Sequence, residues 1–375
     1  MEEKVAERSA SFHFDFNINI ELPFAFQLEE AVCSYGFFMM APNQWDPLSK
    51  TLTRPLSSSS SLVSISQRSQ TLAVRVHALS PQHQHQHQHQ HQHQRHITSQ
   101  ICRMLRLSQA EEKAVMEFRS MTLDLPDRSF AGRVFRSPTL FEDMVKCILL
   151  CNCQWPRTLG MAQALCELQL ELQNGLPHAV TFPNGKDQYF DRTGNFPSPS
   201  ELANLDESFL AKRCGLGYRA AYIIELARAI VEGKIQLEQL EKLSEDASLS
   251  NYKQLDDQLK QIKGFGPFTR ANVLMCLGYY HVIPTDSETL RHLKQVHSRN
   301  TTLKNIEIDL EEIYGKYEPY QFLAFWSEIW DFYQTRFGKM NEMPSSDYKL
   351  ITASNMRSTS EATKKRKRPS RKSQC

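Results

Sequence analysis

A turn built from two glycines constrains the fold of this 375-residue chain more than any other feature. Residues 263–269 read Lys-Gly-Phe-Gly-Pro-Phe-Thr. The stretch before the turn, 255–262, has apolar residues at the spacing of one helix face, and 267–277 contains the apolar side of a second helix. Gly264 and Gly266 permit a tight turn without strain, and the proline that follows suits the first position of a helix. The sequence therefore predicts two helices joined by a glycine turn.

Such a turn is also a candidate anion site. Backbone N–H groups at a helix N-terminus face outward and attract negative charge, and they contact phosphate without reading a base sequence. The residues expected to hold a phosphate backbone at this turn are Lys263, Gly264, Gly266, Thr269 and Arg270. An ordinary helical corner is the alternative, because a single Gly-x-Gly is a weak motif.

A carboxylate lies just beyond the second helix. Asp286, in the sequence Pro-Thr-Asp, follows Gly264 by 22 residues and precedes a further helical pattern. The alternative is a helix N-cap, and Thr285 with Glu288 fits a capping box. Both interpretations can hold, because the macrodipole at a helix N-terminus keeps a carboxylate ionised. An ionised carboxylate there can stabilise a neighbouring positive charge.

Together these residues resemble the helix-hairpin-helix, Gly/Pro…Asp (HhH-GPD) superfamily of DNA glycosylases, especially the alkyl-base (3-methyladenine) and 8-oxoguanine glycosylases. The resemblance covers roughly residues 130–335. It implies that Asp286 is the catalytic carboxylate. It also implies an enzyme of base excision repair that flips a damaged base out of double-stranded DNA and removes it hydrolytically. We expect this enzyme to be a monomer. No iron–sulfur cluster and no other cofactor are expected, apart from a monovalent cation held by carbonyls of the hairpin turn.

Other segments extend the resemblance. Residues 196–202 and 215–223 look like the segment that links helices in these glycosylases, and 141–150 resembles the helix before their DNA-probing loop. By analogy Asn152 enters the gap left by a flipped nucleotide, and Arg157 contacts the orphaned partner base. The alternative is a polar break after a buried helix.

Two departures from the family pattern bear on the chemistry. Family members with lyase activity carry a lysine nucleophile four residues after the first hairpin glycine, where this chain has Phe268. Arg270 replaces a residue that is usually small, which leaves the detailed alignment of the hairpin open. Phe268, Phe322 and Trp326 form the expected base pocket, since aromatic walls suit a cationic alkylated base. The alternative for such a stripe is ordinary core.

We therefore expect a monofunctional glycosylase acting on damaged, alkylated bases. One rival is an oxidised-base glycosylase with lyase activity, which needs a lysine near Asp286. The other rival is a non-catalytic DNA-binding protein that uses the hairpin only to dock. The Pro-Thr-Asp context and the long span of resemblance argue against the second rival.

The distribution of charge limits how the chain can bind DNA. There are 44 Lys and Arg against 42 Asp and Glu, a net charge of +2. Residues 364–372 hold seven basic groups and no acid, so the remainder has 37 basic against 42 acidic groups. Contact with DNA must therefore come from a local face and from helix N-termini. The basic run predicts a nuclear localisation signal or a flexible DNA-binding arm, and a merely solvated end is the alternative.

Other motifs predict little chemistry. No apolar stretch is long enough to span a membrane, and the N-terminus lacks the pattern of a secretory signal. Cys147, Cys151, Cys153 and Cys166 match neither a zinc site nor an iron–sulfur loop, so no metal site is expected. Cys147 and Cys151 lie four residues apart on an apolar helix, which predicts buried thiols. The alternating His-Gln tract 82–94 predicts a disordered loop without a physiological metal role.

The fold class expected is α+β: a mostly helical body, a small N-terminal antiparallel sheet and a disordered basic tail. Strict alternation of apolar and polar residues in 12–26, and apolar runs at 62–65 and 72–76, predict the strands. The expected parts are a sheet domain at 10–100, a helical HhH-GPD domain at 101–338 with its hairpin at 252–279, and the tail at 340–375.

Overall fold

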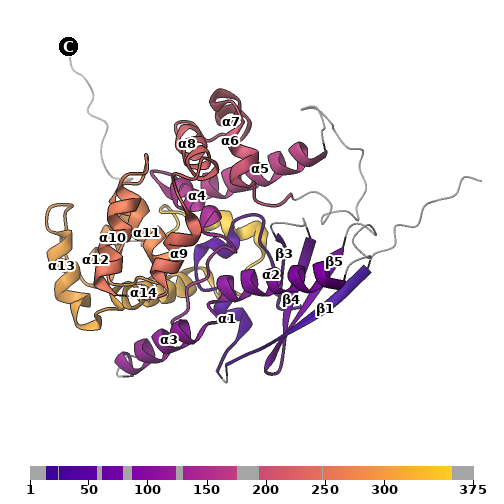
Figure 1. Ribbon diagram of the computed structural model, residues 1–375. Coiled ribbons are helices and arrows are strands. Elements are labelled where there is room, and N and C mark those ends of the chain that lie inside the picture. Colours follow the sequence, from indigo (N-terminus) through magenta and orange to yellow (C-terminus); the bar gives the residue numbers. More distant parts are fainter. Residues whose placement is uncertain are drawn as a thin grey trace, which may run out of the picture.

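The computed structural model describes residues 14–23, 25–56, 61–78, 87–123, 130–174, 194–246 and 248–356. It has the expected class, a mostly helical molecule with one antiparallel sheet contributed by the N-terminal part of the chain (Figure 1). Within those residues no helix is both long and apolar enough to cross a membrane.

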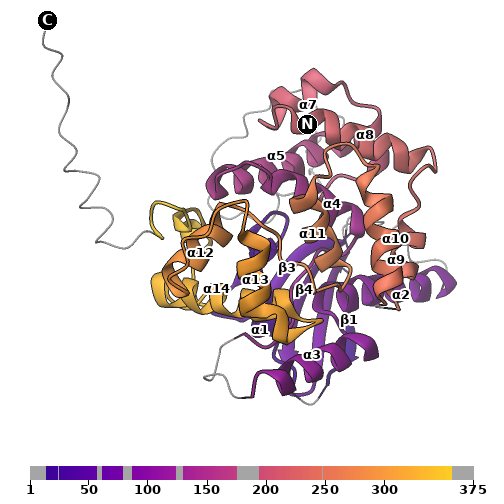
Figure 2. The same cartoon turned by 90° about the vertical axis from the view of Figure 1, so that its left-hand side faces the viewer.

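Helices make up most of the chain after residue 87. Their bounds are α1 Leu28–Val32, α2 His87–Leu105, α3 Gln109–Met121, α4 Leu140–Leu150, α5 Trp155–Asn174, α6 Pro199–Ala203, α7 Glu207–Arg213, α8 Arg219–Val231, α9 Leu237–Ser244, α10 Leu249–Lys260, α11 Pro267–Cys276, α12 Ser287–Val296, α13 Ile306–Tyr314 and α14 Gln321–Phe337. Figure 2 shows α10 and α11 together beside α4, while α12, α13 and α14 form a neighbouring group. The site described below lies where these two groups meet.

The N-terminal sheet has five antiparallel strands in the order β1-β5-β4-β3-β2. The strands are β1 Phe14–Glu21, β2 Gln44–Asp46, β3 Thr51–Leu56, β4 Ser61–Arg68 and β5 Thr71–Ala78. Val63 and Ile65 of β4 pair with Val76 and Val74 of β5, and all four are fully buried. Their period of two is the signal from which β4 and β5 are predicted.

Strands β2 and β3 are not predicted from the sequence, because β3 lacks a hydrophobic pattern. It contains Pro55, which removes a ladder donor, and Arg54, a charge. Arg54 is nevertheless fully buried, with Nη2 2.8 Å from Oε2 of Glu142 on α4, and Lys146 lies 2.7 Å from Oε1 of the same carboxylate. Burial would raise the pKa of Glu142, but the two cations outweigh it and lower that pKa to about 2. A buried ion cluster therefore fixes this part of the sheet on the helical body.

Two segments expected to be disordered are ordered in part. Residues 79–86 lie outside the described residues, but α2 begins at His87, inside the His-Gln tract. The C-terminal half of α2 supplies Ile97, Ile101 and Met104 to the core, and this packing extends the helix back into the tract. Residues 340–356 also pack on the body, for example through buried Tyr348. The basic run lies outside the described residues.

Candidate active site at the hairpin

The predicted hairpin is formed by α10, α11 and the turn between them, and its two glycines differ in kind. Gly264 has a φ of +87°, and a Cβ there would lie 2.5 Å from Cδ2 of Tyr222. Gly266 has a φ of −67°, and nothing lies within 4 Å of the position that a Cβ would take. The expectation that both glycines are needed to avoid strain is therefore corrected: the fold requires Gly264 alone, and the surface beside Gly266 is open.

The N-terminus of α11 presents main-chain donors at this open surface. Its N-cap, Gly266, has no side chain, and the N–H groups of Phe268 and Thr269 have no acceptor within the helix. The side chain of Thr269 is buried, with Oγ1 3.0 Å from Sγ of Cys151. Thr269 can therefore serve the expected phosphate contact only through its main chain. These amides and the helix dipole favour an anion.

The two cationic side chains of the turn are held in different ways. Arg270 donates to Asp256 of α10, with Nε 2.6 Å from Oδ1, and to the carbonyl of Phe265 at 3.2 Å. Its guanidinium thus joins the two helices of the hairpin, which is the packing alternative that the sequence left open. Lys263 lies at the surface, with Nζ 2.5 Å from Oε1 of Glu225. The side chains of Lys263 and Glu225 are 60% and 44% exposed, so Lys263 can turn toward a ligand.

Asp286 is the N-cap of α12. Its Oδ1 accepts hydrogen bonds from the main-chain N–H groups of Glu288 at 2.8 Å and Thr289 at 2.9 Å, and from the hydroxyl of Thr289 at 3.2 Å. The capping box thus joins Asp286 to Thr289, which corrects the Thr285–Glu288 pairing expected from the sequence. Among the described residues, no hydrogen-bond donor contacts Oδ2. One carboxylate oxygen fixes the helix while the other remains for chemistry.

A groove and a cavity meet at this carboxylate. The groove encloses about 810 Å³ and is lined by the hairpin turn, the loop after α4 and residues 285–287. The cavity encloses about 420 Å³ and is lined mainly by aromatic and aliphatic side chains. Asp286 and Phe268 line both spaces. A volume near 400 Å³ is within the usual range for small-ligand pockets.

The loop after α4 brings only one of its two predicted residues to the groove. Asn152 is exposed at the groove wall and has a φ of +47°, the left-handed conformation that asparagine tolerates better than most residues. Arg157 lies in the first turn of α5, where Nη2 donates to the carbonyl of Gly215 at 3.1 Å, and it lines neither the groove nor the cavity. Its contact with a partner base remains a prediction.

The predicted aromatic residues do form one wall. Phe322 is buried and stacks on Trp326, with ring centroids 6.0 Å apart and planes 11° apart, and both line the cavity. Nε1 of Trp326 donates to the carbonyl of Ser34 at 2.8 Å, which fixes the indole plane. Phe268 closes the side toward the groove. These rings are therefore both core and cavity lining.

Sequence reasoning missed the side chains that complete the cavity. Tyr35 lies 4.8 Å from Trp326 between ring centroids, and its hydroxyl donates to Oδ1 of Asn272 at 2.9 Å. Asn272 in turn donates to the carbonyl of Phe268 at 2.9 Å, so this chain of bonds supports the first turn of α11. Burial raises the pKa of Tyr35 well above its ordinary value, which keeps the phenol neutral. No motif marks Tyr35, because it comes from the N-terminal region, 237 residues from its partner.

The chain is similar in sequence to known DNA repair proteins. A family model described as HhH-GPD superfamily base excision DNA repair protein matches residues 145–317. A DNA-3-methyladenine glycosylase of Bacillus subtilis (strain 168) is 28% identical over 204 residues, which is 54% of this chain and 60% of that protein. A putative DNA-3-methyladenine glycosylase of the same organism, YfjP, is 24% identical over 172 residues, 45% of this chain and 58% of the relative. The chain thus spans about three fifths of these relatives' lengths.

Solved structures share the fold at low sequence identity. The 3-methyladenine DNA glycosylase from Archaeoglobus fulgidus aligns with a TM-score of 0.56 and 18% identity, covering 86% of this chain and 99% of that one. The Clostridium acetobutylicum 8-oxoguanine glycosylase/lyase in its apo form aligns with a TM-score of 0.54 and 14% identity, covering 84% and 97%. Since the two neighbours differ in the base that they are named for, the fold does not select between alkylated and oxidised substrates.

Proposed function

We propose that the chain is a monofunctional DNA glycosylase acting on alkylated bases in double-stranded DNA, and the match of residues 145–317 to the model of the HhH-GPD superfamily of base excision DNA repair proteins supports this proposal. The observation that carries the proposal is the position of Asp286. It lies where the groove along the hairpin meets the aromatic cavity, with Oδ2 uncommitted. A backbone in the groove would place one nucleotide at the mouth of the cavity.

Binding starts at the hairpin. The main-chain N–H groups of Phe268 and Thr269 hold a phosphate, and Lys263 adds a charge from the rim. Flipping a nucleotide costs a few kcal/mol, and the cost is least for a base whose pairing is already weakened. Asn152, which is exposed and lines the same groove, fills the gap that the flipped nucleotide leaves.

The cavity favours a base that carries positive charge. Its walls include the stacked rings of Phe322 and Trp326 and the ring of Tyr35. A cation over such faces gains about 0.5–2 kcal/mol, more when water is excluded. The same charge makes the alkylated base a good leaving group, so the site needs little help for departure of the base.

The chemical step then needs one carboxylate and one water. The bond between the base nitrogen and C1′ of the sugar breaks, its electron pair leaves with the base, and positive charge develops on the sugar ring. Oδ2 of Asp286 stabilises that charge and accepts a proton from the water that adds to C1′. Because Phe268 stands where lyases of this superfamily carry a lysine, the product is an abasic site in an uncut strand.

Base release under single-turnover conditions tests this function. Duplexes that contain methylated bases are incubated with the wild type and with Asp286→Asn, since asparagine caps helices about as well as aspartate. We expect the variant to fold normally and to release base about 100-fold or more slowly. Asp206→Asn is the matched control, because Asp206 caps α7 through a 2.8 Å bond from the N–H of Phe209 and lines neither the groove nor the cavity.

Each other outcome of this assay indicates a different function. Strand cleavage without added base means a lyase, and release only from oxidised duplexes means the other substrate class. Binding without any release means a docking protein.

We also propose nuclear import through the basic run 364–372, so a fluorescent fusion with these basic residues changed to serine should lose nuclear accumulation.

A further inference from the structure

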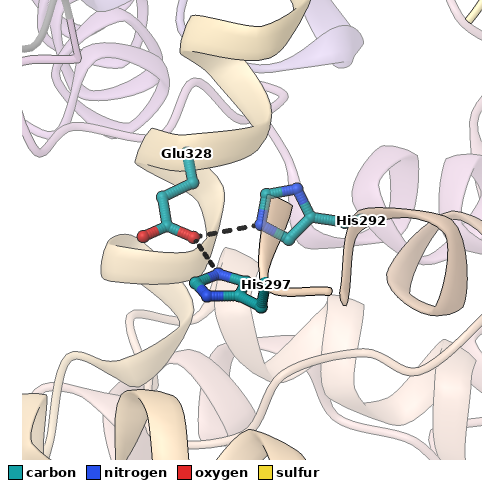
Figure 3. Close-up of side chains that lie close together, drawn as sticks. All are labelled: His292, His297 and Glu328. Atoms are coloured by element: carbon teal, nitrogen blue, oxygen red, sulfur yellow. Dashed lines mark hydrogen bonds and ion pairs between the residues drawn. The ribbon is translucent and has the colours of Figure 1, made fainter. Parts of the chain in front are cut away.

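A second group of polar side chains lies away from the groove and the cavity, and the proposed function does not use it. His292 is on α12, His297 is the C-cap of that helix, and Glu328 is on α14 (Figure 3). Oε2 of Glu328 lies 3.0 Å from Nε2 of His292 and 2.7 Å from Nε2 of His297. The hydroxyl of Tyr314, at the end of α13, lies 2.6 Å from the same oxygen and 3.1 and 3.0 Å from the two imidazole nitrogens. Four ligand-type atoms from three helices thus converge on one point.

The kinds of side chain in this cluster suit a cation. His292 is fully buried, whereas the side chains of His297 and Glu328 are 21% and 18% exposed. The same carboxylate oxygen of Glu328 contacts both imidazoles and the hydroxyl of Tyr314. Neutral imidazoles with one carboxylate are a usual ligand set for zinc.

We propose that His292, His297 and Glu328 bind one divalent transition-metal ion of the zinc type, with the hydroxyl of Tyr314 at the fourth position. A tetrahedral zinc site with bonds of about 2.0–2.1 Å has ligand atoms about 3.3 Å apart. In this cluster Oε2 of Glu328 and the hydroxyl of Tyr314 lie 2.6–3.1 Å from each other and from the two imidazole nitrogens. These five pairs must therefore separate by only a few tenths of an ångström, and the ligand atoms of the two histidines and Glu328 all lie within 4.8 Å of one another.

The closed surroundings indicate a structural ion. None of the four residues lines the groove or the cavity, so no substrate reaches the ion from there. The ion would join the C-terminal end of α12 to α13 and α14. Asp286 caps the other end of α12, and Phe322 and Trp326 lie on α14. The metal would thereby fix the Asp286 carboxylate relative to the aromatic wall of the cavity. Metal binding itself does not depend on the proposed glycosylase function.

The His-Gln tract complicates any metal-binding experiment, because its histidines can also bind metal ions. The starting protein is therefore the full chain with the tract histidines changed to glutamine, stripped with a chelator. It is loaded with Zn²⁺ and dialysed against nitrilotriacetate, and the bound zinc is counted. A parallel sample is loaded with Co²⁺, whose visible absorption is intense in a tetrahedral site and weak in an octahedral one.

We expect one zinc per chain, an intense cobalt spectrum and a Tm that rises with zinc concentration. Glu328→Gln and His297→Gln should each lower zinc affinity by more than the about 10–100-fold that loss of an outer-sphere partner costs. His281→Gln, which removes a half-buried histidine near Tyr252, should leave zinc binding unchanged.

Zinc that is lost on dialysis, a weak octahedral cobalt spectrum, or equal affinity in the variants would each overturn the proposal. Circular dichroism reports whether a variant folds. If Glu328→Gln does not fold, the decision rests on His297→Gln, whose side chain is 21% exposed and tolerates change better than His292. Zinc binding and base release are measured separately, so failure of one proposal is distinguishable from failure of the other.

Discussion

Alanine substitutions at the two glycines of the hairpin turn should separate an effect on stability from an effect on DNA binding. At Gly264 a methyl group meets two obstacles. A φ of +87° disfavours an L-residue by about 1–2 kcal/mol, and a Cβ 2.5 Å from Cδ2 of Tyr222 requires a displacement of that ring that costs about 1–3 kcal/mol. We therefore expect Gly264→Ala to lower the free energy of unfolding by about 2–5 kcal/mol.

At Gly266 the same substitution should leave the fold nearly unchanged. Its φ of −67° suits alanine, and no atom lies within 4 Å of the added carbon. Restricting the unfolded chain stabilises by about 0.4–1 kcal/mol, and replacing an N-cap glycine with alanine costs a similar amount. The methyl group would, however, cover the first-turn amides of α11. We expect DNA affinity to fall at least about tenfold, which is ~1.4 kcal/mol.

Urea denaturation measures the first quantity and fluorescence anisotropy with a labelled duplex measures the second. The double variant Gly264→Ala, Tyr222→Ala should lose less stability than the sum of the two single variants, because the second change removes the clash. A Gly264→Ala protein as stable as the wild type would refute the steric argument. Full DNA affinity in Gly266→Ala would refute the assignment of the phosphate to this turn.

Three further predictions follow from the charged groups. Lys263→Ala should leave stability unchanged, because its partner Glu225 is exposed, but should lower the slope of log affinity against log salt by about 1 in a salt titration of DNA binding. Arg270→Ala, which leaves the partly buried Asp256 unpaired, should lower the free energy of unfolding in urea by about 1 kcal/mol and leave that salt slope in place. Glu328 has a folded pKa of about 2 against an ordinary 4.5, so its contribution is present above pH 4.5 and is lost as the pH falls toward 2. Between these values the wild type should lose about 3 kcal/mol more stability than Glu328→Gln, and parallel pH curves would contradict this.

Local signals in the sequence were sufficient for the hairpin and for the carboxylate. Helical periodicity, a glycine turn and a proline at the first position of α11 are properties of adjacent residues, and the structure forms the turn where they place it. Asp286 as an N-cap is likewise a local property, although the capping partner is Thr289 rather than the pair expected. Sheet strands with a period of two were predictable for the same reason.

What local signals predicted poorly are positions whose environment comes from distant segments. An arginine is usually expected at the surface, yet Arg54 in β3 is buried. Glu142 of α4 pairs with it, and Lys146 of the same helix pairs with Glu142. The phosphate contact of Arg270 stays a prediction, and the structure adds an ion pair with Asp256 of the preceding helix that was not expected.

The sequence by itself determined the helical class, the glycine turn and the single carboxylate beyond it, because each depends on residues within a few turns of one another. Only the tertiary structure decided what surrounds them. It places Tyr222 against Gly264 and brings together His292 and Glu328 from two helices. It also brings Tyr35 to the cavity, where its hydroxyl contacts Asn272, a residue 237 positions later in the sequence. Such contacts arise from packing of separate elements into one core, and no spacing along the chain encodes them.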